Sequence, residues 1–95
     1  MNIKDVIQCE QGWNKVIYSC HSELMAIDPL YKPLQIKEKF GSLRYYYTGG
    51  DECIAGMVNL AEELSARICE RCGNPGKIRT GGWLKTLCDE HDTRK

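Results

Sequence analysis

The sequence has no excess of charge of either sign, because thirteen lysines and arginines balance thirteen aspartates and glutamates at neutral pH. A domain that binds nucleic acid mainly through phosphate contacts is normally strongly basic, so this balance counts against that class. The charge is nevertheless uneven along the chain, since residues 32–44 are mainly basic and residues 51–68 mainly acidic. The neutral total therefore hides a basic segment beside an acidic one.

Long hydrophobic runs are also missing. No apolar stretch approaches the roughly 20 residues of a membrane span, and residues 1–13 lack the apolar centre and cleavage site of a signal peptide. We therefore expect a cytoplasmic protein without membrane contact. Six cysteines would suggest three disulfides in a small secreted chain, whereas in an intracellular chain their spacing favours metal binding.

No repeat, low-complexity tract or linker divides the 95 residues, a length that suits a single domain. Apolar spacing predicts two amphipathic helices, over about residues 13–27 and 51–68. The first should end before Asp28-Pro29, because the residue before a proline avoids helical geometry. A short helical turn over residues 3–7 should precede it.

Between the helices the sequence period changes to that of strands. Apolar and polar residues alternate over residues 34–47, which predicts a β-hairpin that turns at residues 39–42. The apolar positions are Leu34 and Ile36 on the first strand and Leu43, Tyr45 and Tyr47 on the second, and we expect the last three to pack under the helices. Residues 1–68 should therefore form an α+β core with both helices on one face of the hairpin.

Residues 69–91 read CERCGNPGKIRTGGWLKTLCDEH and carry the strongest signal in the chain. Two cysteine-containing pairs stand fifteen residues apart, with two residues inside each pair, which is the spacing of a zinc site. The predicted ligands are Cys69, Cys72, Cys88 and His91. A small hairpin with its tip at residues 80–82 would bring the pairs together, as a zinc-ribbon or zinc-knuckle module that holds one structural Zn²⁺ per chain.

The same residues argue against a catalytic metal. Catalytic zinc normally has three protein ligands and one open position, whereas four ligands are present here. The zinc-deaminase pattern and the H-E-x-x-H helix are both absent from the sequence. We therefore expect a protein that is not an enzyme, in which zinc binding contributes folding free energy.

Three cysteines lie outside the predicted metal site, namely Cys9, Cys20 and Cys53. Cys20 lies on the apolar stripe of the first helix, which indicates a buried structural thiol rather than a nucleophile. His21 cannot activate it, because adjacent residues of a helix point in different directions.

Residues 37–47 combine basic and aromatic side chains, as sheets that bind nucleotides or single strands do. Lys37, Lys39, Arg44 and Tyr46 are the candidate contact residues on this hairpin, and the alternative is an ordinary half-buried hairpin. Trp83 is the fifth candidate. It would either anchor a partner or cover the zinc site.

The motifs QIKEKFGSLRYYY and CERCGNPGKIRTGGWLKTLCDEH, joined by an amphipathic helix, resemble a family of small phage and prophage proteins of unassigned function. The resemblance spans residues 12–91. It implies a gene from mobile DNA and a bacterial host cytoplasm, where such proteins often act on host defence or regulatory components.

We therefore expect a zinc-stabilised binding protein whose partner is a host protein or a small anionic nucleotide. The alternative is a nucleic-acid-binding zinc module with a regulatory role. Two amphipathic helices on a short sheet would also leave an apolar patch for self-association into a homo-oligomer.

Overall fold

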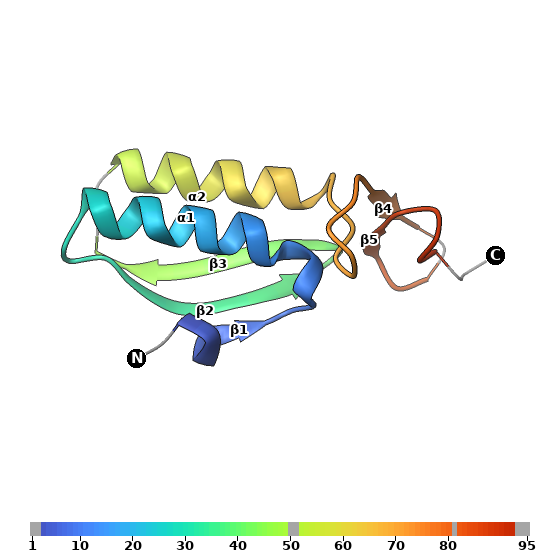
Figure 1. Ribbon diagram of the computed structural model, residues 1–95, viewed down its shortest axis with the longest axis horizontal. Coiled ribbons are helices and arrows are strands. Elements are labelled where there is room, and N and C mark those ends of the chain that lie inside the picture. Colours follow the sequence, from blue (N-terminus) through green and yellow to red (C-terminus); the bar gives the residue numbers. More distant parts are fainter. Residues whose placement is uncertain (1–2, 50–51, 81, 93–95) are drawn as a thin grey trace.

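The computed structural model describes residues 3–49, 52–80 and 82–92. Two helices lie side by side on one face of a three-stranded sheet, and a two-stranded sheet forms one end of the molecule (Figure 1). The molecule is elongated, with extents of 46 × 24 × 20 Å. The predicted α+β class is confirmed. No helix among the described residues is both long enough and apolar enough to span a membrane.

The first helix, α1, spans Asn14–Ile27 and begins directly after a 3-10 turn, η2, at Gln11–Trp13. Its end at Ile27 agrees with the predicted stop before Asp28-Pro29. An earlier 3-10 turn, η1, spans Ile3–Val6, with both of its end residues buried.

The second helix, α2, spans Glu52–Ser65, and Asp51, where the sequence predicted its start, lies outside the described residues. The predicted end at Ile68 is wrong by three residues. The reason is that Ile68 forms a β-bridge with Pro75 and therefore already belongs to the turn that carries the first cysteine pair.

Strands β2, at Lys32–Lys39, and β3, at Ser42–Thr48, form the predicted antiparallel hairpin. A third strand, β1, at Ile7–Gln8, runs parallel to β2 at the edge of the sheet. The sequence did not predict β1, because two residues are too few to show an alternating pattern.

The core lies between the helices and the sheet. Ile36, Leu43 and Tyr45 are buried there, while Tyr47 is only half-buried. Leu34 is 56% exposed, which contradicts an uninterrupted alternation along β2. The cause is a register shift between Pro33 and Gln35, which interrupts the alternation of faces.

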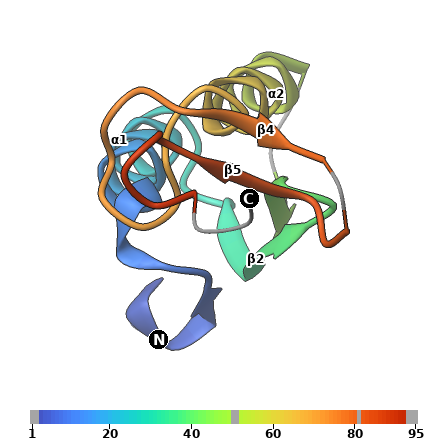
Figure 2. The same cartoon turned by 90° about the vertical axis from the view of Figure 1, so that its right-hand side faces the viewer.

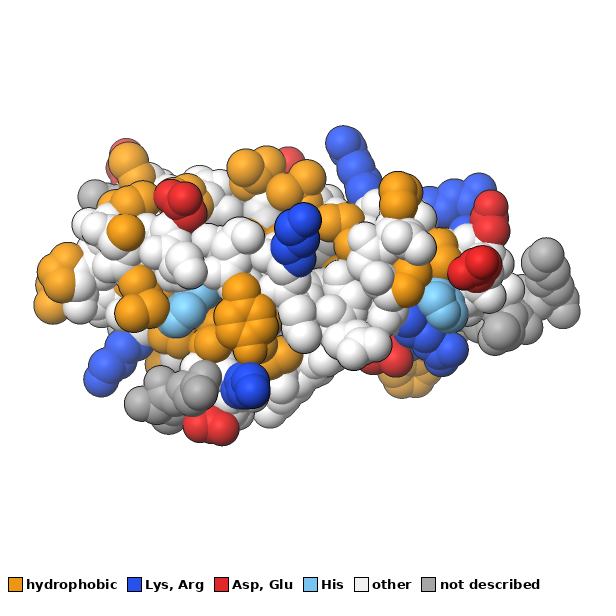
Figure 3. All heavy atoms as spheres, in the orientation of Figure 1, with side chains coloured by type: hydrophobic (Ala, Val, Ile, Leu, Met, Phe, Trp, Pro, Cys, Tyr) orange, Lys and Arg blue, Asp and Glu red, His pale blue; other side chains and the backbone are white. Residues whose placement is uncertain are grey.

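The groove between α1 and α2 is lined mainly by apolar side chains. Figure 3 shows hydrophobic side chains over the helices at the upper edge of the molecule. On α2, Leu60 and Leu64 are 56% and 40% exposed. With Val16 and Met57 they line a groove of about 360 Å³ between α1 and α2. Self-association through this face stays a prediction.

The C-terminal hairpin consists of β4, at Lys77–Arg79, and β5, at Lys85–Leu87. Figure 2 shows that β4 and β5 run across this end of the molecule, and β5 and the residue before it contact the turn of the β2–β3 hairpin. The Thr86 hydroxyl donates a hydrogen bond to the Gly41 carbonyl, and a Cβ at Gly41 would come within 3.3 Å of the Leu84 backbone. This close approach joins the two sheets.

Candidate metal centre

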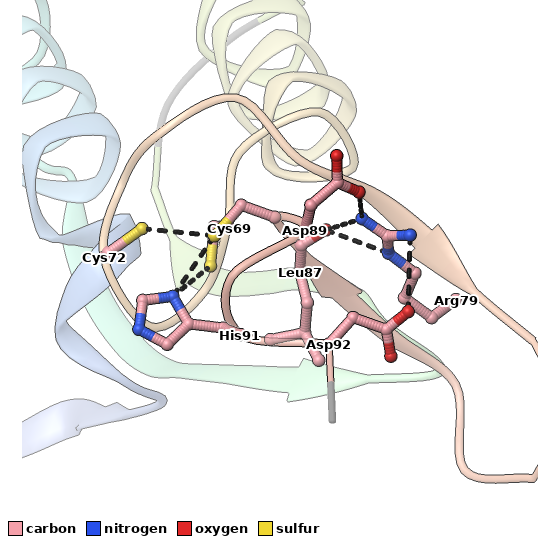
Figure 4. A network of polar contacts seen from close by, with 8 residues as sticks. Cys69, Cys72, Arg79, Leu87, Asp89, His91 and Asp92 are labelled. Carbon is pink, nitrogen blue, oxygen red and sulfur yellow. Dashed lines mark hydrogen bonds and ion pairs between the residues drawn. The ribbon is translucent and has the colours of Figure 1, made fainter. Parts of the chain in front are cut away.

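Three cysteine sulfurs and one imidazole come together where the turn before β4 meets the turn after β5. The ligand atoms of Cys69, Cys72, Cys88 and His91 all lie within 4.8 Å of one another (Figure 4). The Cys72 and Cys88 sulfurs are 3.7 Å apart, and His91 Nδ1 lies 3.6 Å from the Cys69 sulfur and 3.2 Å from the Cys88 sulfur. The four residues therefore lie close enough to bind one metal ion.

These separations fit coordination rather than covalent pairing. A disulfide needs sulfurs about 2.05 Å apart, and all six cysteines are free thiols. Around a tetrahedral ion with bonds of about 2.3 Å to sulfur and 2.0 Å to nitrogen, neighbouring sulfurs would be about 3.8 Å apart. A sulfur and a nitrogen would be about 3.5 Å apart. The three spacings of 3.7, 3.6 and 3.2 Å are close to the edges of such a tetrahedron, and the other three lie within 4.8 Å.

Local turns present each pair of ligands. The Gly73 N–H donates to the Cys69 carbonyl, and the Cys69 N–H donates to the Asn74 carbonyl. Gly73 has φ of +84°, a conformation that glycine adopts without strain. On the other side, the N–H groups of His91 and Asp92 both donate to the Cys88 carbonyl. The two-residue spacing inside each pair thus closes a tight turn.

The Arg79 side chain stabilises the turn that carries Cys88 and His91. Its guanidinium donates to the Leu87 carbonyl, at 3.1 Å from Nε and 3.0 Å from Nη2, and to Asp89 Oδ1 at 2.8 Å. Nη1 also lies 3.3 Å from Asp92 Oδ2 (Figure 4). Arg79 therefore ties β4 to the residues on either side of Cys88, and it acts as a support for the ligand turn rather than as a free surface cation.

The environment of the sulfurs favours thiolate at one of them. Burial raises the pKa of the Cys69 thiol, but the N–H groups of Cys88, Cys72 and Arg71 hydrogen-bond to its sulfur, and the net pKa is lowered to about 6. At Cys72 the Asn74 N–H lowers the pKa, whereas desolvation and the sulfurs of Cys69 and Cys88 raise it above the ordinary value. Like charges among three sulfurs are relieved when a cation binds, because metal ligation deprotonates thiols.

The metal centre is anchored to the core through the start of α1. The Gly12 N–H donates to the Glu70 carbonyl at 2.6 Å, and the Trp13 indole N–H donates to the Ile68 carbonyl at 2.9 Å. Trp13 is fully buried. The residues just before and just after Cys69 thus hold the 3-10 turn η2, from which α1 continues.

An ionic cluster around one buried carboxylate lies at the same junction. The Glu70 carboxylate is almost fully buried, accepts from the Glu10 N–H at 3.2 Å and lies 3.6 Å from the Lys85 ammonium. Lys85 also lies 3.7 Å from Glu10. Desolvation raises the pKa of Glu70, and the Glu10 N–H and the Lys85 charge oppose that rise. Sequence reasoning missed Arg79 and Lys85 as structural residues, because a basic residue in a predicted hairpin is normally solvated.

With four protein ligands, a tetrahedral ion in this site has no position left for a substrate or a water molecule. Glu90, next to His91, is exposed. The geometry is that of a closed site that crosslinks two turns of the chain.

The five candidate contact residues lie at two separate places on the surface. Lys37 pairs with Arg44 across the hairpin, and Lys37 Nζ lies 5.9 Å from the centre of the Tyr46 ring. Tyr46 is 44% exposed, as expected for a residue that alternates with the buried Tyr45. Lys39 and Trp83 lie apart from these residues, in a hollow between the hairpin turn and the C-terminal module. Trp83 therefore lines that hollow rather than covering the sulfur cluster.

Cys9 and Cys20 have the environments of inert thiols, whereas Cys53 is exposed. Burial raises the pKa of Cys20 to about 11, and burial together with the nearby Glu70 and Glu10 carboxylates raises that of Cys9 to about 12. His21 Nδ1 is 2.9 Å from the Tyr31 hydroxyl, so its ring is engaged away from Cys20.

No family model, curated protein or solved structure matches the chain. The resemblance to small phage proteins therefore stays a prediction that depends on two sequence motifs.

Proposed function

We propose that the protein is a non-enzymatic binding protein, held together by one structural zinc ion, that recognises an anionic partner through the exposed face of its β-hairpin. The resemblance to phage proteins extends the proposal to a component of a bacterial host. That component would be a defence or regulatory protein, or a small nucleotide that signals to one, in the cytoplasm.

The donor set supports zinc as the metal. Three cysteines and one histidine within reach of one ion match the ligand set of structural zinc sites. The zinc ion would hold the pair Cys69 and Cys72 to the pair Cys88 and His91, and would so keep the C-terminal hairpin against the core. A chain of this size has a small core, and a metal supplies stability that the core lacks.

The uncompensated cations of the hairpin are the observation that carries the proposal. Lys37 and Lys39 lie on the face of β2 that the helices do not cover, and neither forms an ion pair with any residue in the described part of the chain. The only acidic residue of the two strands, Glu38, accepts the Gly41 N–H at 2.8 Å. Arg44 is partly balanced, because it lines a hollow together with Glu62 and Glu63. The electrostatic potential of this face is therefore positive, and it is most positive around the two lysines.

Tyr46 adds an aromatic surface beside Lys37. An exposed ring next to a cation on an open sheet is how several single-strand and nucleotide binders stack bases. This observation favours the second candidate function, a nucleic-acid-binding zinc module. The neutral total charge opposes it, since affinity for long nucleic acids depends on neutralising many phosphates.

A charge-neutralising pair of substitutions tests the proposal. Lys37→Gln with Lys39→Gln should weaken binding of a mononucleotide, of oligothymidylate or of an acidic peptide, whichever the wild type binds, by at least about tenfold. Each lysine is exposed or half-exposed and unpaired, so the melting temperature should hardly change. Lys77→Gln, an equal loss of charge on the exposed side of β4, is the matched control and should bind normally.

The salt dependence of binding separates the two candidate functions. A steep dependence indicates several phosphates and therefore nucleic acid, whereas a slope near one or two charges indicates a small anion. Unchanged affinity of the double lysine variant for every probe that the wild type binds would show that the hairpin face is not the binding site.

A further inference from the structure

Phe40 occupies a backbone conformation that suits it poorly. It has φ of +55°, followed by Gly41 at +85°, so the two residues form the tight turn between β2 and β3. Both central positions of such a turn have positive φ and favour Asn-Gly or Gly-Gly. A bulky residue with positive φ is a rare outlier, and such strain often marks a functional position. Among the described residues, Phe40 is the only non-glycine residue with positive φ.

Packing does not explain why a phenylalanine is there. Its side chain is 66% exposed, so the ring gains little from burial. The neighbouring Gly41, not Phe40, makes the contact between the hairpin turn and the C-terminal module. The Gly41 carbonyl accepts a hydrogen bond from the Thr86 hydroxyl, and Gly41 lies close to the Leu84 backbone. Asparagine at position 40 would preserve that contact and suit the turn better.

The Phe40 ring lines one side of a hollow of about 480 Å³, and Trp83, which is 74% exposed, lines another. Lys39, Glu38, Gly82 and Leu84 complete the lining described for this hollow. The volume falls within the range of about 300–1,000 Å³ that small-molecule sites occupy. The hollow thus brings together the two most exposed aromatic side chains of the described residues, from segments that are distant in the sequence.

A cation stands at the Phe40 side of the hollow. Lys39 Nζ lies 5.5 Å from the centre of the Phe40 ring and, like Lys37 on the same strand, forms no ion pair with a described residue. A ligand that enters between the aromatic side chains would therefore meet a positive charge at one end. Rings that stack and an adjacent cation together suit a planar base that carries a phosphate.

We infer that the hollow between Phe40 and Trp83 binds a nucleobase, stacked on these two side chains, with its phosphate at Lys39. This inference rests on the proposed function, because the phosphate would use Lys39, one of the two lysines of the proposed binding face, and it adds the site and the chemical class of the ligand. The base belongs either to a free nucleotide or to an unpaired nucleotide of a single strand.

The test exploits the strain at Phe40. Phe40→Asn should keep or raise the melting temperature, because asparagine tolerates positive φ, and it should lower affinity for a purine mononucleotide about 5- to 150-fold, the usual effect of one base–aromatic stack. Trp83→Leu should lower that affinity by a similar factor. Leu30→Asn, which removes a hydrophobic side chain that is 75% exposed in the loop after α1, is the matched control and should leave affinity unchanged.

Tryptophan fluorescence provides the readout, since the chain has two tryptophans and Trp13 is fully buried. Nucleotide binding should change the emission of the wild type and of Phe40→Asn at saturation, and the change should disappear in Trp83→Leu. Ribose 5-phosphate is the second probe, because it has the phosphate and lacks the base. It should bind the wild type more weakly than the mononucleotide binds Phe40→Asn, because that variant keeps the stack on Trp83.

Three results would overturn the inference. If ribose 5-phosphate binds as tightly as the mononucleotide and still depends on Lys37 and Lys39, the anion site stands and the stacking site does not. If Phe40→Asn lowers the melting temperature without changing nucleotide affinity, Phe40 is structural. If an acidic peptide binds and neither a nucleotide nor oligothymidylate does, the hollow takes a protein. Tighter, steeply salt-dependent binding of oligothymidylate that Phe40→Asn abolishes would support the site and identify its ligand as a single strand.

Discussion

The contact between Gly12 and the residues after α2 predicts an unusually large effect of a single methyl group. A Cβ at position 12 would lie 2.2 Å from the Cys69 carbonyl oxygen and 2.3 Å from the Glu70 carbonyl oxygen. Both atoms belong to the backbone of the turn that carries Cys69 and Cys72, so no flexible side chain can move aside. We expect Gly12→Ala to separate the start of α1 from the metal centre.

The size of the effect follows from that geometry. Restoring an ordinary contact requires a movement of about 1 Å, which stretches the 2.6 Å hydrogen bond from the Gly12 N–H to the Glu70 carbonyl beyond bonding distance. An unsatisfied buried N–H costs about 1–3 kcal/mol, and overpacking costs about 1–3 kcal/mol more. A loss of about 2–6 kcal/mol should lower the melting temperature by at least about 8 °C in a domain of this size.

Gly56→Ala is the matched control. Gly56 lies within α2, and a Cβ there would meet nothing within 4 Å. Replacing an exposed mid-helix glycine by alanine should stabilise the protein by about 1 kcal/mol. Thermal and urea unfolding of the metal-loaded proteins should therefore move in opposite directions for the two variants. A Gly12→Ala protein that melts within about 2 °C of the wild type would refute the close approach on which this reasoning depends.

Three further predictions concern the metal and the titratable groups. Chelation of the metal at neutral pH should unfold the protein cooperatively. Cys72→Ala should give the same circular dichroism spectrum as the chelated wild type. A metal-free protein that keeps its thermal transition would contradict a structural role for the metal. Because burial lowers the pKa of His21 below its ordinary 6.5, protonation favours the unfolded state, so stability should be complete above about pH 6.5 and should fall below it. His21→Asn should remove that part of the pH dependence in urea unfolding, and an equal slope in both proteins would refute it. In the metal-loaded protein, iodoacetamide should modify the exposed Cys53 well before the buried Cys20, as measured by peptide mass spectrometry, and faster modification of Cys20 would contradict its raised pKa.

The elements with long periodic patterns were predictable from the sequence. The apolar stripe of α1 and the alternation of Leu43 and Tyr45 on β3 each extend over enough residues to show their period, and the structure confirms both elements. The cysteine spacing likewise identified the four residues that lie within reach of one ion, because two-residue spacing encodes a local turn.

What the sequence could not show depends on contacts between distant segments. The parallel pairing of β1 with β2 and the contact of Gly12 with Glu70 join residues that no local pattern relates. The shift at Pro33 reverses the expected burial of Leu34 for the same reason, since register is a property of two strands. Phe40 did carry a local signal, because a phenylalanine before the glycine of a two-residue hairpin turn is unusual. Its meaning became visible only with Trp83 on the other side of the hollow.

The contacts of Gly12 and Trp13 with the residues around Cys69 also have a consequence for the synthesis of the chain. The Trp13 indole finds its partner at Ile68, 55 residues later, and the second ligand pair follows that partner by another twenty residues or so. At about 5–20 residues per second, a ribosome needs several seconds to deliver them. During that interval the first helix lacks these contacts, and its apolar stripe is open to chaperones and proteases. Translation that stops between the two ligand pairs should therefore yield a product destined for degradation rather than a partly active fragment.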